Sequence, residues 1–267
     1  MLTNATFFKN LAIHATDGEL GTVDDFYFDD ETWAIRYLTV ETGGWLSGKQ
    51  VLISPISIVS VDWQAKRLDV ALTKKQVEGS PDIDTHMPVS RQHEVAYSDY
   101  FGYSYYWGGP SLWGPTSYPS NLAAPTNGSV AAMKKRMQRE STDSHLRSAE
   151  SVTGYHVGAT DGEIGHLNGF VVDDEMWAIR YIEVSTRNWL PGKKVLVAPA
   201  WIERVSWTDS KVDVGLSREA IESAPEYLLS KPMTREYENR LYFHFGRLAY
   251  WVNEDEKKSS VALSSGV

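Results

Sequence analysis

The sequence predicts a mainly β protein with added helices. It predicts two small closed β-barrels, each followed by short helices and arranged as a pseudo-twofold internal repeat. Two observations predict this class. Shifting the chain by 144 residues, from Asp17 to Asp161, aligns its halves without a gap as far as Trp107 and Trp251. Within each half, short apolar segments alternate with turns rich in Gly, Asp and Pro, a spacing typical of small barrels.

Turn signals delimit each strand of the first half. Asp17-Gly18 separates a short apolar segment from a longer one, and Asp29-Asp30-Glu31 ends the longer segment. Gly43-Gly44 and Pro55 interrupt the later runs, because glycine and proline break strands. The predicted strands are residues 11–16, 21–28, 33–40, 50–54, 56–63 and 67–72.

Helices follow each set of strands. Thr73 and Ser217 are N-cap residues at matching positions, before short helices at residues 74–78 and 218–223. A later stripe at helical spacing predicts a second helix in each half, and we expect these two helices at the contact between the copies. The stripe comprises His93, Tyr97, Phe101 and Ser104, matched by Tyr237, Leu241, Phe245 and Leu248.

The predicted organisation has four parts. Residues 1–107 form the first repeat with its helical appendage, and residues 151–252 form the second. Between them, residues 108–150 form a linker rich in Pro, Gly and aromatic residues, with a basic helix at 131–140. Residues 253–267 form a flexible tail.

Charge and composition argue against several classes of protein and of binding site. The net charge of −9, from 26 basic and 35 acidic residues, disfavours direct nucleic-acid binding. The absence of cysteine excludes disulfides, thiolate metal sites and cysteine nucleophiles, and it fits a cytoplasmic location. No apolar run reaches the roughly 18 residues of a membrane span, and the N-terminus lacks a signal-peptide pattern. Peripheral docking at a membrane stays open.

Catalytic and ligand-binding motifs are absent. The sequence has no Gly-x-Ser-x-Gly elbow and no phosphate-binding glycine loop, so we predict that the protein is not an enzyme and holds no cofactor. Acidic clusters at the turns have two interpretations, a cation site or a solvated hairpin, and the solvated hairpin is favoured. They comprise Asp24, Asp25, Asp29, Asp30 and Glu31, and Asp173, Asp174 and Glu175.

Histidines do not indicate a metal site by their spacing. None recurs at a matched position in the two halves, and none lies four residues from another beside a glutamate. We therefore predict no metal ligands among them. The seven are His14, His86, His93, His145, His156, His166 and His244.

The aromatic run between Tyr97 and Trp113 is the strongest candidate for a binding surface, because Tyr and Trp dominate interface hot spots. Alternatively, the run packs on its own barrel, which the repeat of Phe101-Gly102 as Phe245-Gly246 favours. An RNA-stacking role is opposed by the flanking acids. The basic helix, with Lys134-Lys135-Arg136, is interpreted as a solvated face. The candidate partner-binding residues are Tyr100, Tyr103, Tyr105, Trp107 and Trp113.

The turn and strand residues together resemble the PRC-barrel family, over residues 11–80 and 155–224. The residues that carry the resemblance are Asp17, Gly18, Gly21, Asp29, Val40, Pro55 and Asp69-Val70, repeated as Asp161, Gly162, Gly165, Asp173, Val184, Pro199 and Asp213-Val214. The family includes the cytoplasmic domain of the photosynthetic reaction-centre H subunit and a domain of a ribosome-maturation factor.

The resemblance implies a six-stranded barrel that serves as an interaction module. We therefore expect a non-enzymatic scaffold with a protein partner, in which the two repeats pair within the chain. Two alternatives remain. One is an H-subunit-like component docking at a photosynthetic or electron-transport membrane complex, and the other is an accessory of RNA processing or ribosome assembly.

Overall fold

The computed structural model describes residues 1–46, 48–81, 89–107, 109–123, 145–186, 193–229 and 233–252. The predicted linker helix at residues 131–140 and the predicted tail at 253–267 lie outside these ranges. The chain divides into two compact units, residues 1–154 with 169–182 and residues 155–168 with 183–267. A hairpin of the second repeat, residues 169–182, thus belongs to the first unit. The four-part organisation by repeat stays a prediction.

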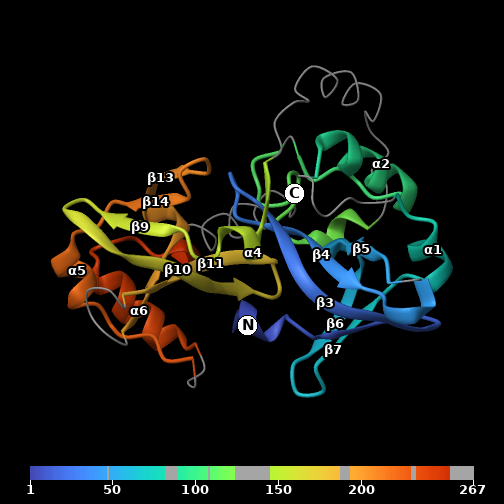
Figure 1. Cartoon of the computed structure of the whole chain (residues 1–267), viewed down its shortest axis with the longest axis horizontal. Helices are drawn as coiled ribbons and strands as arrows, with labels where there is room; N and C mark the ends of the chain where they lie inside the picture. Colours follow the sequence, from blue (N-terminus) through green and yellow to red (C-terminus); the bar gives the residue numbers. More distant parts are fainter. Residues whose placement is uncertain are drawn as a thin grey trace, which may run out of the picture. The chain divides into compact units, whose positions relative to one another are not determined.

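The predicted mainly β class with added helices is confirmed (Figure 1). The elements of the first repeat are β1 (Leu2–Asn4), η1 (Ala5–Phe7), β2 (Ala12–Ala15), β3 (Gly18–Asp29), β4 (Ile35–Glu41), η2 (Gly43–Leu46), β5 (Gln50–Ile53), η3 (Pro55–Ser57), β6 (Ile58–Asp62), β7 (Arg67–Val70), α1 (Lys74–Glu78), α2 (Arg91–Phe101) and η4 (Pro119–Leu122). The later elements are β8 (Leu146–Ser148), α4 (Ala149–Val152), β9 (His156–Ala159), β10 (Gly162–Asp173), β11 (Ala178–Ser185), β12 (Lys194–Val197), η5 (Pro199–Trp201), β13 (Ile202–Ser206), β14 (Lys211–Val214), α5 (Arg218–Glu222) and α6 (Arg235–His244).

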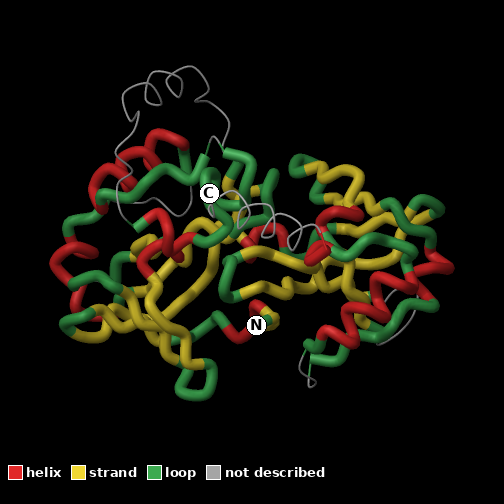
Figure 2. Tube along the Cα trace, turned by 180° about the vertical axis from the view of Figure 1, so that it is seen from behind, coloured by secondary structure: helices red, strands yellow, loops and turns green. Residues whose placement is uncertain are grey.

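Both repeats have the same strand order. The first sheet runs β5-β4-β3-β2-β7-β6, and the second runs β12-β11-β10-β9-β14-β13. β3 pairs antiparallel with both β2 and β4, whereas β2 pairs parallel with β7 and β9 pairs parallel with β14. In the first unit, helices α1 and α2 lie on the outer side of the strands (Figure 2).

The prediction that each sheet closes into a barrel is wrong, because the backbone hydrogen bonds between the described strands do not form a closed ring. Among the described strands, β5 and β6 are the two ends of the first sheet, and no pairing joins them. The connection between them explains this result. Pro55 has no N–H, and the next three amides bond within the turn: Ile56 N–H to the Ser54 hydroxyl, Ser57 N–H to the Ser54 carbonyl and Ile58 N–H to the Pro55 carbonyl. These groups are therefore unavailable to a closing ladder.

Two glycines allow a close backbone approach in matching places. Gly21, at a φ of +148°, bends β3 over the end of β4, where an added Cβ would lie 2.0 Å from the Glu41 carbonyl oxygen. Gly165 does the same in β10 against the Ser185 carbonyl oxygen, also at 2.0 Å. The register of each β2–β3 type hairpin shifts beside this glycine, which is the mark of a β-bulge.

A tryptophan turns each long hairpin. The sequence places Trp33 in a strand, but the structure gives it a left-handed φ of 60°, and its counterpart Trp177 has a φ of 52°. A bulky residue in this region is an outlier that its surroundings must hold in place. The Trp33 carbonyl accepts from the Ile179 N–H at 2.8 Å, and the Trp177 carbonyl accepts from the Ile35 N–H at 2.8 Å. The left-handed turns thus direct two carbonyls toward each other's hairpin, and the resulting hydrogen bonds join the two hairpin tips inside the first unit.

Two three-residue strands, which the sequence does not predict, exchange between the repeats within this unit. β1 pairs antiparallel with β10, with Leu2 opposite Asp173. β8 pairs in the same way with β3, with Leu146 opposite Asp29. Each repeat thus adds its leading strand to the long strand of the other, and this covers an otherwise exposed backbone edge.

We expect Gly21→Ala to lower the free energy of unfolding by about 3 kcal/mol or more, because it combines a strained φ with a backbone clash. Urea unfolding of the full chain measures this loss. Gly44→Ala is the control, since its new Cβ meets no atom within 4 Å. Equal effects of the two substitutions would show that the close approach at Gly21 does not constrain the fold.

Candidate functional site

Helix α2 covers the free edge of β5. The helix begins after Ser90, whose hydroxyl accepts from the His93 N–H at 3.2 Å, and it ends at Gly102 with a left-handed φ of 71°. Its Tyr97 is 1% exposed. The Tyr97 hydroxyl accepts from the Ser54 N–H at 3.0 Å and donates to the Leu52 carbonyl at 3.2 Å. The helix therefore satisfies backbone groups that an additional strand would otherwise bond.

Arg36 of β4 forms the polar centre of the first unit and is only 1% exposed. Its guanidinium donates to Asp29 Oδ2 at 3.0 Å, to Thr32 Oγ1 at 2.9 Å and to the Leu112 carbonyl at 2.9 Å. Burial alone would raise the pKa of Asp29, but the Arg36 charge and the N–H groups of Thr32 and Glu31 lower it. Asp29 therefore stays ionised and balances the buried arginine.

Two aromatic rings, set edge to face with an angle of 78° between their planes, contact the same guanidinium. The central carbon of Arg36 lies 3.8 Å from the centre of the Tyr106 ring and 4.6 Å from that of the Trp113 ring. These distances are within the range of cation–π attraction. The Trp113 Nε1 donates to the Met176 carbonyl at 2.8 Å, so the aromatic segment also contacts the hairpin of the second repeat inside this unit.

A buried acid adjoins the Tyr106 ring. Glu94 of α2 is 2% exposed, and it accepts a hydrogen bond from the Tyr106 hydroxyl. Arg91 pairs with the Glu94 carboxylate at 2.9 Å and donates to the Tyr106 hydroxyl at 3.1 Å. Burial raises the pKa of Glu94 to about 7, against the lowering effects of Arg91 and Tyr106. Glu94 therefore changes its protonation state near neutral pH.

The structure places three of the predicted partner-binding residues against the unit. Trp113 is fully buried at 0% exposure, and Tyr105 is 7% exposed. Tyr105 stacks on Trp107 with ring centres 4.7 Å apart, and its hydroxyl donates to Asp99 at 2.6 Å. The Arg91 guanidinium lies 4.6 Å from the Trp107 ring centre. These contacts account for packing within the unit.

The other two predicted residues lie nearer the surface. Tyr103 stacks on Phe101 with ring centres 5.5 Å apart, and burial raises its pKa to about 12. Tyr100 is 44% exposed, and its hydroxyl donates to the Gln76 carbonyl at 2.9 Å. A partner-binding role for the five aromatic residues stays a prediction, and Tyr100 offers the largest exposed fraction.

The second unit repeats part of this arrangement. Arg235 pairs with Glu238 at 2.9 Å, and the Tyr250 hydroxyl donates to Glu238 at 3.1 Å. The Arg235 guanidinium lies 4.0 Å from the Trp251 ring centre. These residues match Arg91, Glu94, Tyr106 and Trp107 of the first repeat. The arginine, acid and aromatic set is therefore a feature of each repeat.

Three exposed apolar side chains occur between residues 243 and 252, at and after the end of α6, where the sequence predicts a packed stripe. Leu248, a member of that stripe, is 82% exposed, and Phe243 is 90% exposed. Val252 follows at 42%. The sequence contains a signal for this exposure that we did not use. The residues of the first repeat that match Phe243 and Leu248 are the polar Asp99 and Ser104.

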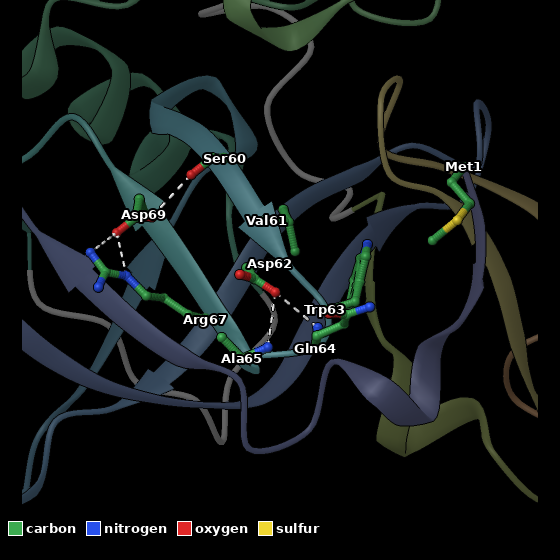
Figure 3. Close-up of a pocket in the computed structure, with 9 residues that line it drawn as sticks. All are labelled: Met1, Ser60, Val61, Asp62, Trp63, Gln64, Ala65, Arg67 and Asp69. Atoms are coloured by element: carbon green, nitrogen blue, oxygen red, sulfur yellow. Dashed lines mark hydrogen bonds and ion pairs between the residues drawn. The ribbon is translucent and has the colours of Figure 1, made fainter.

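A shallow hollow of about 690 Å³ lies beside the β6–β7 hairpin (Figure 3). Its lining residues are Met1, Ser60, Val61, Asp62, Trp63, Gln64, Ala65, Arg67 and Asp69. Asp69 accepts from Arg67 and Ser60, and Asp62 accepts from two backbone N–H groups of the turn. These hydrogen bonds hold Asp69 and Asp62 against their own hairpin.

Several acids at the turns pair with other segments of the first unit. Asp30 pairs with Arg147 at 2.8 Å, and Asp174 pairs with the amino group of Met1. Asp25 accepts from the Glu150 N–H at 3.1 Å. These acids therefore bind segments from the other repeat, which the interpretation as solvated hairpins did not predict.

No helix in the described part of the chain has the length and apolar character that crossing a membrane requires.

We expect Arg36→Ala to lower the free energy of unfolding by about 3–5 kcal/mol, because it leaves Asp29 buried without its counter-charge. Chemical unfolding monitored by tryptophan fluorescence measures the loss. The control is Arg67→Ala, whose side chain is 50% exposed and pairs with Asp69. A surface pair of this kind contributes less than about 1 kcal/mol. Similar losses for both variants would contradict a central role for Arg36.

Glu94 makes stability depend on pH. Its pKa rises from 4.5 to about 7 on folding, so the folded chain binds the proton more tightly than the unfolded chain. We expect the free energy of unfolding to fall by about 3 kcal/mol between pH 4.5 and 7 through this group. The decrease should disappear in Glu94→Gln and persist in Glu78→Gln, which alters an exposed carboxylate. Urea unfolding across this pH range tests the difference, and an unchanged slope in Glu94→Gln would refute it.

Comparison with known proteins identifies one domain of the chain. The model of the PRC-barrel domain matches residues 8–77, which span β2 to β7 and most of α1. Over 68 residues the chain is 41% identical to an uncharacterized protein of Deinococcus radiodurans, and this match covers 25% of the chain and 24% of that relative. The second repeat reproduces the strand order of the matched domain. Residues 8–77 therefore carry a PRC-barrel domain, and the strand order of this domain recurs in the second repeat.

Proposed function

We propose that the chain is a non-enzymatic interaction protein that binds a protein partner in the cytoplasm. The observation that carries this proposal is the exposure of three apolar side chains at and after the end of α6, Phe243, Leu248 and Val252. Apolar side chains exposed together mark binding surfaces more often than single exposed residues do. An aromatic residue that is 90% exposed is a suitable hot-spot anchor once a partner buries it.

The contrast between the repeats supports this assignment. Asp99 and Ser104 occupy the positions in the first repeat that match Phe243 and Leu248. Helix α2 therefore forms with a polar residue at the position of Phe243, and Phe243 and Leu248 are too exposed to contribute to a core. Their presence in the second repeat alone favours a role outside the fold.

The hydrogen-bonding pattern also supports a binding role over a catalytic one. Arg36, Glu94 and Tyr106 form a polar cluster that is buried beneath aromatic rings. The acids of the hollow and of the turns bond to neighbouring groups of the same unit. The exposed Tyr100 provides a second contact region in the first unit.

The double variant Phe243→Asp with Leu248→Ser tests the proposal, because it installs the residues of the first repeat. The full chain is used as bait in a host extract, and captured proteins are quantified by mass spectrometry with and without detergent. We expect at least a tenfold loss of a specific captured protein, since hot-spot truncations cost about 2 kcal/mol or more each.

Val59→Glu is the matched control. Val59 is 68% exposed, and the second repeat has Glu203 at its position. Capture that survives in Val59→Glu and is lost in the double variant supports the proposed surface. Equal capture by all three proteins would refute it. The identity of the lost protein separates the alternatives, because a membrane-complex subunit supports H-subunit-like docking and a ribosomal protein supports an assembly role.

A further inference from the structure

Three potential metal ligands meet on one face of the second unit. His156 of β9 lies directly opposite His166 of β10 in the antiparallel register. Their ring centres are 4.6 Å apart, and His156 Nδ1 lies 3.1 Å from Glu163 Oε1. The ligand atoms of all three side chains lie within 4.8 Å of one another.

The bulge at Gly165 brings Glu163 to this face. Side chains alternate across a regular strand, so residues three apart point to opposite sides. Here Glu163 pairs with Gly158 and His166 pairs with His156, because one extra residue separates them on β10. The close approach of Gly165 to Ser185 fixes the bulge, since an added Cβ would lie 2.0 Å from the Ser185 carbonyl oxygen. The backbone thus places the three side chains on one face before any ion binds.

The ligand chemistry selects a class of ion. Two imidazoles and one carboxylate suit Zn²⁺ and neighbouring first-row transition ions, whereas Mg²⁺ and Ca²⁺ prefer oxygen ligands alone. Bonds of about 2.0–2.2 Å place two ligands of one ion no more than about 4.3 Å apart. The present separations of up to 4.8 Å need only side-chain rotations. Such rotations are available, because the side chains of His156 and Glu163 are 56% and 58% exposed.

Neighbouring charges leave the site able to accept a cation. Lys211 of β14 lies opposite His156 in the parallel register. Its amino group is held by Asp213 at 2.7 Å, and Arg204 pairs with the same carboxylate at 2.9 Å. Asp213 therefore offsets part of the positive charge on this face.

The first repeat provides an internal comparison. Ala12 and Thr22 face each other there in the register of His156 and His166, and Glu19 matches Glu163. The hairpin folds around the same bulge without either imidazole. The two histidines are thus additions to a common scaffold, and folding does not require them.

We propose that His156, Glu163 and His166 bind a divalent transition ion of the Zn²⁺ type, with solvent completing its coordination. The site is independent of the proposed partner surface. Because protons compete for the imidazole nitrogens, binding weakens in acid.

Isothermal titration of the full chain with Zn²⁺, after removal of bound metal by chelation, tests the site. We expect about one ion per chain, and at least a tenfold weaker affinity in His156→Ala with His166→Thr. Those residues are the ones found in the first repeat, so the variant is expected to fold, and circular dichroism checks this. Glu163→Gln should also weaken binding, since it removes the anionic ligand.

His14→Ala is the control, because His14 lies opposite Glu19 in the first repeat and should not affect the ion. Visible absorption of bound Co²⁺ provides a second measurement, and its tetrahedral or five-coordinate bands should vanish in the double histidine variant. Zn²⁺ binding that is unchanged in this folded variant, or no binding by the wild-type chain at 100 µM ion, would overturn the proposal.

Discussion

The buried charge of Arg36 is the constraint on which the first unit depends. A guanidinium removed from water must find a counter-charge and hydrogen-bond acceptors, or the fold loses several kcal/mol. Asp29 provides the charge, and the Leu112 carbonyl provides an acceptor far along the chain. The rings of Tyr106 and Trp113 cover the planar group. One residue of the sheet thereby fixes the hairpin turn and the aromatic segment that follows α2.

The two repeats share some structural features and differ in others. Both repeats retain the glycine at the close backbone approach, the left-handed tryptophan and the Asp–Arg pair at the long hairpin. They differ where the scaffold tolerates change. Tyr97, which caps the edge of β5, is replaced by Leu241, and polar residues beside α2 become apolar beside α6. Function specific to one repeat is therefore best sought at these differing positions.

Local signals predict much of the fold, and pairings between distant segments limit the rest. The strands from Ala12 to Val70 follow from turn residues and apolar runs that act over a few neighbours. β1 and β8 have three residues each, too few for any periodicity, and they exist because the other repeat supplies a partner. The left-handed conformation of Trp33 could not be predicted for the same reason, since a hydrogen bond from the second repeat holds it. Burial of Trp113 depends on Arg36, a residue 77 positions earlier in the sequence.

The histidine pair shows how a hairpin can carry information that linear spacing conceals. His156 and His166 match no helical metal motif, yet a hairpin centred on Asp161-Gly162 places them opposite each other. The bulge needed for packing at Gly165 then adds Glu163 to the same face. Because the first repeat keeps this bulge with Ala12 and Thr22, packing alone maintains the geometry. A rigid feature selected for stability thus provides fixed surface positions at which two substitutions suffice to complete a set of ligands.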